Sequence, residues 1–118
     1  MSCLFRSLTY FNNTDTETTR KLICDYLSDA GPIIDGINTK DLLNIIKRDY
    51  ILKMRLSSEW GGGIEIQAAC NIWGFIINVH NVRNSPPSII AFTPITPHHK
   101  LTECDISWNG VHYQPINK

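Results

Sequence analysis

Cys3 and His112, near opposite ends of the chain, could act together as a thiol nucleophile and its general base. A thiol attacks as its thiolate, and the first turn of a helix favours that anion because unpaired N–H groups and the helix dipole carry partial positive charge there. The segment "CLFRSLTYF" predicts such a helix, with Cys3 in its first turn. His112 follows a predicted tight turn, so a strand would hold its imidazole in place, as a base requires. The alternative interpretation is a cysteine that only packs and a histidine on the surface.

Apolar residues at helical spacing predict the elements that would position Cys3. The first helix runs from about Cys3 to Tyr10, with Ser2 as its N-cap. In the next, "TDTETTRKLICDYLSDAGP", Thr14 and Glu17 have the spacing of a capping box. The apolar face of this second helix comprises Leu22, Ile23, Tyr26 and Leu27.

Two further helices are predicted in the middle of the chain. The segment "TKDLLNIIKRDYILKM", capped at Thr39, reads as one continuous amphipathic helix. Its apolar stripe comprises Leu42, Leu43, Ile46, Tyr50 and Met54. The segment "IEIQAACNIWG" is apolar on most sides, which predicts a buried helix with a left-handed cap at Gly74.

The C-terminal third has the composition of strands. "FIINVH" and "SIIAFTPI" are rich in β-branched and aromatic residues, and the turn-forming residues 84–87 separate them. In "DISWNGVHYQPI", Asn109-Gly110 predicts a type I′ hairpin turn, which needs positive φ at both central residues. Helices followed by strands indicate an α+β domain.

Composition limits the classes of function. At 118 residues the chain predicts a single domain, residues 1–118, with one core. Eleven basic residues balance eleven acidic ones, which argues against nucleic acid or an anionic membrane as partner. Because no apolar stretch approaches the roughly 20 residues of a membrane span and no signal sequence opens the chain, we expect a cytoplasmic or nuclear location. We also expect a monomer.

The other cysteines and histidines give little support for a metal site. Cys24, Cys70 and Cys104 lie among apolar residues without a C-x-x-C pair, so we expect reduced thiols in the core. The His98-His99 pair could bind a metal or sense pH, and a solvated loop is the alternative. We therefore expect no metal and no cofactor.

Three segments resemble motifs of the ovarian-tumour-domain (OTU) cysteine proteases, in the order of that family. "SCLFRSL" is similar to the segment that carries the catalytic thiol, and "VHYQPI" to the closing strand that carries the base. "EWGGGIEIQAACNIWGFIINV" resembles the middle motif, a Trp-Gly-Gly turn followed by a helix and a strand. The resemblance implies a papain-like OTU fold, with a small, mostly antiparallel sheet packed against helices.

The resemblance also implies a deubiquitinase acting on ubiquitin or a ubiquitin-like protein. Cys3 would attack the carbonyl at the C-terminal glycine and form a thioester, backbone N–H groups would hold the oxyanion, and His112 would move the proton. Trp60 and the glycines after it would serve as scaffold, with Trp60 packing.

Two positions depart from the family pattern. In the family, the nucleophile stands in an Asp-Gly-x-Cys pattern. Here only Met1 and Ser2 precede Cys3, so the Asp-Gly pair is missing. The family places Asp or Asn two residues after the base, whereas this chain has Gln114, whose side-chain oxygen can still accept a hydrogen bond from the ring. Asn109 is another candidate for this orienting role. The alternative function is therefore an OTU-like module that binds ubiquitin without efficient catalysis.

Overall fold

The computed structural model describes residues 2–116. The helices are α1 (Cys3–Asn12), α2 (Thr16–Ser28), α3 (Thr39–Ile46), α4 (Tyr50–Met54) and α5 (Gly63–Trp73). The strands are β1 (Phe75–Asn81), β2 (Ser88–Phe92), β3 (Thr102–Trp108) and β4 (Tyr113–Pro115). Within residues 2–116, no helix combines the length and the apolar character needed to cross a membrane.

The strands form one mixed sheet in the order β2-β1-β3-β4. β1 pairs with β2 and β3 with β4 in antiparallel fashion, whereas the central pair, β1 and β3, is parallel. Helices come first along the chain and the sheet follows, so the α+β prediction is confirmed. The parallel central pair arises because a long connection, which includes β2, separates β1 from β3.

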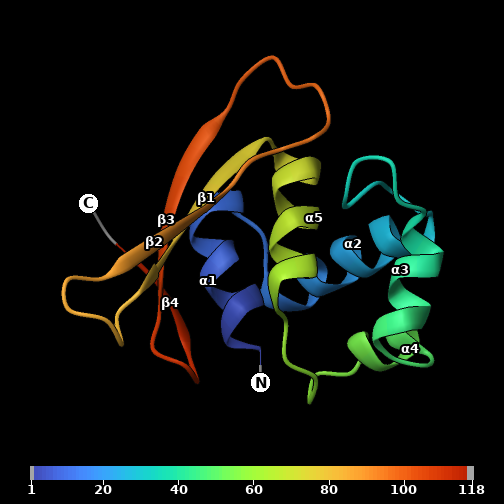
Figure 1. Ribbon diagram of the computed structural model, residues 1–118, viewed down its shortest axis with the longest axis horizontal. Coiled ribbons are helices and arrows are strands. Elements are labelled where there is room, and N and C mark those ends of the chain that lie inside the picture. The colour runs from blue at the N-terminus through green and yellow to red at the C-terminus, as the bar shows by residue number, and fades with distance from the viewer. Residues whose placement is uncertain (1, 117–118) are drawn as a thin grey trace.

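The two faces of the sheet differ in chemistry because side chains alternate along a strand. Figure 1 shows α1 and α5 beside the sheet, with α2, α3 and α4 farther from it. On the face that joins the core, Ile77 of β1 lies opposite Cys104 of β3, and both are fully buried. On the other face, His80 Nε2 lies 2.8 Å from an Asp105 carboxylate oxygen. The core therefore occupies one side of the sheet, between strands and helices.

The predicted third helix is wrong in one respect, because the chain breaks it into α3 and α4. Lys47 is extended and Asp49 has a left-handed φ of 56°. After the break, the Tyr50 hydroxyl reaches Glu65 of α5 and Lys47 pairs with Glu59. These tertiary contacts outweigh the helical pattern of the segment.

The caps of three helices also differ from prediction. The side chains of Asp15 and Asn38, rather than those of Thr14 and Thr39, accept the capping hydrogen bonds of α2 and α3. Ser2 is the N-cap residue of α1, as predicted, but its side chain makes no capping hydrogen bond. The predicted cap at Gly74 is confirmed, with a φ of 69°.

Candidate active site

Cys3 opens α1, and the core holds this helix in place. The next two residues, Leu4 and Phe5, are buried, as is Leu8 one turn farther on. The hydroxyl of Ser7 donates to the Cys3 carbonyl over 2.7 Å. Cys3 itself is half-buried. The helix thus fixes the backbone of Cys3 while leaving its thiol accessible.

His112 lies in the loop 109–112, immediately before β4, and this loop is not the predicted type I′ turn. Gly110 has a φ of 98°, but Asn109 does not have the positive φ that a type I′ turn needs. Instead, the Asn109 side-chain oxygen accepts hydrogen bonds from the backbone N–H groups of Val111 and His112, at 2.9 and 2.8 Å. Asparagine commonly stabilises turns by bonding to backbone N–H groups in this way. Asn109 therefore positions the backbone of His112 rather than its ring.

The fold brings the two ends of the chain together at one groove. The N-terminus of α1 lies beside β4 (Figure 1), and the backbone N–H of Tyr113 points at the Cys3 sulfur with an N···S distance of 3.5 Å. Cys3, His112 and Gln114 all line a groove of about 510 Å³. The three residues singled out in the sequence are therefore neighbours around one accessible space.

Gln114 is exposed and lies opposite Ser107 of β3. It stands two residues after His112, on the side of the groove. In the described part of the chain, no hydrogen bond joins Gln114 to the ring of His112. Its role as the orienting residue remains a prediction.

Trp60 contacts His112, which the sequence did not indicate. Trp60 is 44% exposed, and its ring centroid lies 6.0 Å from that of His112, so the tryptophan packs against the histidine rather than in the core. Gly61 lets this loop approach α1, since a Cβ at Gly61 would lie 2.7 Å from Leu4 Cδ2. The only available signal was the Trp-Gly-Gly motif, which does not reveal what the tryptophan contacts. The indole ring therefore lies beside the imidazole ring of His112.

A buried carboxyl group holds the glycine loop that follows Trp60. Glu65 is 1% exposed and accepts one hydrogen bond from the Gly62 N–H at 2.8 Å and another from the Tyr50 hydroxyl at 2.6 Å. Burial raises the pKa of Glu65. Burial, together with the Glu65 charge, raises the pKa of Tyr50 as well. This pair joins α4, the loop and the start of α5.

The chain's other thiols lie away from solvent, as predicted. Cys24, Cys70 and Cys104 are fully buried. Burial raises the pKa of Cys24 to about 11 and those of Cys70 and Cys104 to about 12. Because a nucleophile must be a thiolate, these three are inert at neutral pH. Cys3 is the accessible thiol.

Among residues 2–116, no group of three or more His, Cys, Asp or Glu residues could hold a metal ion. The prediction that His98 and His99 lie in a solvated loop holds for only one of them. His99 is exposed, whereas His98 Nε2 lies 2.9 Å from the carbonyl oxygen of Asn71 and is half-buried. His98 therefore ties its loop to the end of α5.

Comparison with known proteins identifies the fold. Neither the family models nor the curated proteins include a match to the chain. A solved OTU domain in complex with ubiquitin matches with a TM-score of 0.63 and 24% identity over 97% of this chain. The OTU domain of OTUD1 matches with a TM-score of 0.60 and 19% identity, covering 99% of this chain and 79% of that one. This protein therefore has the OTU fold, and it spans 62% of the length of the ubiquitin-bound chain.

Proposed function

We propose that the protein is a thiol-dependent deubiquitinase of the OTU type. It hydrolyses the bond after the C-terminal glycine of ubiquitin or a ubiquitin-like protein. The observation that carries this proposal is that Cys3, at the start of α1, and His112 border the same groove in a chain with the OTU fold. Gln114 is the third residue of the proposed site.

The proposed reaction has two steps. His112 takes the thiol proton, and the Cys3 sulfur attacks the glycine carbonyl to form a tetrahedral intermediate. Backbone N–H groups at the first turn of α1 stabilise its oxyanion. The imidazolium then gives its proton to the leaving amine, which leaves a thioester. His112 next activates water, which attacks the thioester and releases the glycine carboxylate and the free thiol.

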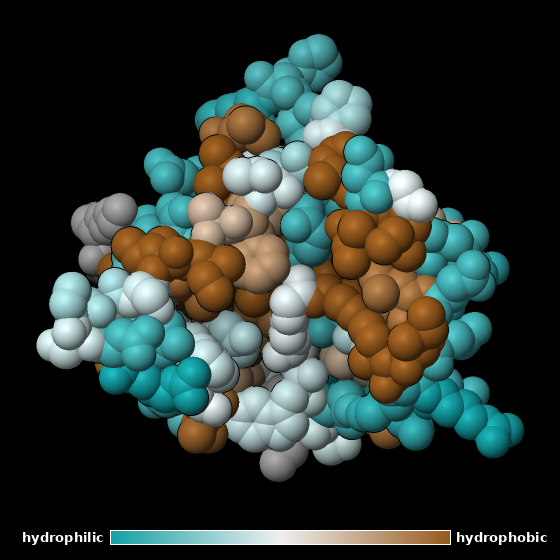
Figure 2. Space-filling model, in the orientation of Figure 1, coloured by the Kyte–Doolittle hydropathy of each residue, from teal (hydrophilic) through white to brown (hydrophobic). Residues whose placement is uncertain are grey.

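Two observations support a protein as the substrate. A protein with the same fold has been solved in complex with ubiquitin. Large apolar side chains are also exposed on α3 and α4: Ile45 is 83% exposed and Leu52 is 70% exposed. Figure 2 shows hydrophobic surface on the side of the molecule where these helices lie. Exposed apolar patches of this kind are typical of surfaces that contact proteins.

A ubiquitin with a thiol-reactive group at its C-terminus tests the proposal. We expect one adduct per chain, on Cys3, and none with Cys3→Ala. Cys24→Ala is the matched control and should react like the starting protein, because Cys24 is buried and its pKa is raised. An adduct that survives Cys3→Ala would contradict the assignment.

A ubiquitin-binding module without catalysis is the second candidate. The observation that favours it is the exposed Gln114, which cannot stabilise an imidazolium as a carboxylate does. This function predicts saturable binding of unmodified ubiquitin, measured by calorimetry, together with no adduct and no hydrolysis. Binding by both the starting protein and Cys3→Ala, with neither protein active, would select it.

A further inference from the structure

Arg20 of α2 is a buried cation whose hydrogen-bond partners are all neutral. It is 6% exposed, and its guanidinium lies 4.1 Å from the centroid of the Phe5 ring. Within residues 2–116, Arg20 forms no ion pair with a carboxylate, whereas the nearby Arg55 pairs with Asp25. Burying a charge is costly unless its donors are satisfied, so the contacts of Arg20 must be specific.

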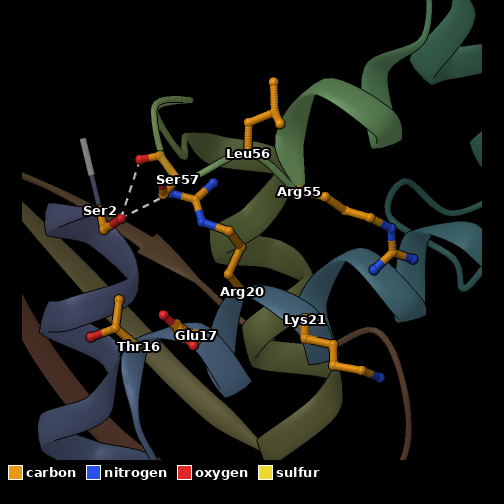
Figure 3. A pocket seen from close by; sticks show the side chains of 8 residues that line it. All are labelled: Ser2, Thr16, Glu17, Arg20, Lys21, Arg55, Leu56 and Ser57. Carbon is orange, nitrogen blue, oxygen red and sulfur yellow. Dashed lines mark hydrogen bonds between the residues drawn. The ribbon is translucent and has the colours of Figure 1, made fainter.

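These contacts join three separate segments of the chain. Nη1 donates to the Met54 carbonyl at the end of α4 over 2.7 Å. Nη2 donates to the Ser2 hydroxyl at 3.1 Å and to the Glu59 carbonyl at 3.0 Å. Figure 3 shows the bond to Ser2 at the edge of a pocket of about 520 Å³, where Ser2 also reaches the Ser57 carbonyl. One guanidinium thus connects the start of α1 to the loop after α4.

Two of the residues that Arg20 contacts, Ser2 and Glu59, are sequence neighbours of residues in or beside the candidate site. Ser2 directly precedes Cys3, and the Ser2 carbonyl accepts the first hydrogen bond of α1, from Arg6. Glu59 directly precedes Trp60, whose ring contacts His112. Because Nη2 donates to both segments at once, a shift of one moves the geometry of the other.

We infer that Arg20 is a positioning residue that aligns Cys3 with His112: it holds the first turn of α1 through Ser2 and the indole beside His112 through Glu59. This inference rests on the proposed function, because it assigns a role to Arg20 in that same site. The geometry needs the planar fork of arginine, which can donate to several acceptors in fixed directions. A lysine ammonium would keep the charge but not these directions.

Matched variants separate positioning from simple support of the fold. Arg20→Met keeps the length of the side chain and removes the charge, while Arg20→Lys restores the charge alone. Ser2→Ala removes the Arg20 bond nearest Cys3, together with the longer bond from Ser2 to the Ser57 carbonyl. Arg55→Met is the control, because Arg55 lines the same pocket but pairs with Asp25 on the surface.

The principal measurement is the rate at which iodoacetamide alkylates Cys3, followed by intact mass on variants that circular dichroism shows to be folded. At about pH 6, a cysteine is alkylated quickly only if an aligned histidine stabilises its thiolate. At about pH 9, a free thiol is largely ionised without a neighbouring histidine. A merely structural residue leaves the ratio of the two rates unchanged. In parallel, kcat and KM are measured with a fluorogenic ubiquitin amide.

We expect Arg20→Met to slow alkylation at least about tenfold at the lower pH, with rates within about twofold at the higher pH. Arg20→Lys should recover part of this loss, and Ser2→Ala should slow the low-pH reaction about fivefold, because it removes one hydrogen bond to a charged group. The losses should appear in kcat, with KM within about twofold. Arg55→Met should match the starting protein at both pH values.

Folded Arg20→Met with low-pH alkylation within about twofold of the starting protein would overturn the inference. If the Arg20 variants do not fold, Ser2→Ala decides, and an unchanged rate ratio overturns it. The inference is also overturned if, in the starting protein, the alkylation rate of Cys3 rises with pH in the same way as that of a free thiol. If Cys3 alkylation depends on Arg20 but no ubiquitin amide is hydrolysed, the deubiquitinase proposal fails while the positioning role of Arg20 stands.

Discussion

The two sides of the candidate site are supported very differently. Cys3 begins a helix whose next two residues are buried, and the cation of Arg20 lies over the ring of Phe5. His112 is exposed, in a loop that leads into a strand of three residues. Asn109 and Trp60 are the side chains that hold or contact it. The nucleophile is thus anchored in the core, whereas the base depends on local contacts.

This difference predicts that stability and activity can be changed separately. Mutations beneath Cys3 should lower the free energy of unfolding, because they remove buried apolar contacts. Mutations around His112 should leave the fold intact and change the alignment of the base. The following predictions test this contrast, beginning with the largest expected effect.

Phe5→Ala should destabilise the protein by about 3–5 kcal/mol, because it empties a fully buried aromatic site. On the other side, Val111→Ala should change the free energy of unfolding by less than about 0.5 kcal/mol, because Val111 is exposed. Urea unfolding measures both. Equal losses in the two variants would mean that the two sides do not differ in their support.

Asn109→Ala should lower kcat by as much as about a hundredfold, the scale of a misplacement of about 1 Å in an active site. The reason is that Val111 and His112 lose the oxygen that accepts their N–H groups. Asn109→Asp keeps an acceptor and should retain most of the activity. Asn84→Ala, in another exposed turn, is the control. Steady-state hydrolysis of a ubiquitin amide measures all three, and full activity in Asn109→Ala would contradict the role given to this loop.

The sequence predicted the elements better than it predicted the contacts between them. Periodicity is a local property, so α5 and its cap at Gly74 could be predicted from residues 64–74 alone. The break after α3 could not be predicted in this way, because Glu59 and Glu65, the partners of Lys47 and Tyr50, lie outside the segment. Tertiary contacts of this kind override local propensity.

The same distinction applies to the candidate site. Cys3, His112 and Gln114 stood out by residue type and by resemblance, and the structure brings them to one groove. Trp60 and Arg20 could not be placed from the sequence, since a tryptophan in a glycine-rich turn and an arginine in an amphipathic helix fit many environments. Their contacts depend on how distant segments meet.

Gln114→Asp should raise the rate of hydrolysis about tenfold if it provides a carboxylate beside the imidazolium, because one pKa unit corresponds to about 1.4 kcal/mol. Gln114→Asn and Gln114→Ala separate charge from hydrogen bonding. A shorter side chain must also reach the ring from the same position on β4. If Ala is as active as the starting protein and Asp gives no gain, Gln114 does not orient the base.

The smallest expected effect concerns the loop between the two sides, which Glu65 holds through Gly62. Burial raises the pKa of Glu65 above its ordinary value of 4.5, so the folded protein binds this proton more tightly than the unfolded chain. The stability contributed by this group is therefore fully present below the unfolded pKa and is lost as the pH rises toward the folded one. Compared with Glu65→Gln, the starting protein should lose unfolding free energy over this range.

Glu59 provides a control of opposite sign at the other end of the same loop. A hydrogen bond from Lys47 lowers the pKa of Glu59, so its contribution is present above the unfolded pKa and is lost as the pH falls. Urea unfolding of the starting protein, Glu65→Gln and Glu59→Gln across acidic pH should therefore give difference curves with opposite slopes. Two curves with the same slope would show that burial does not control Glu65. The pH dependence of the loop beside His112 would then come from surface charge rather than from the buried Glu65.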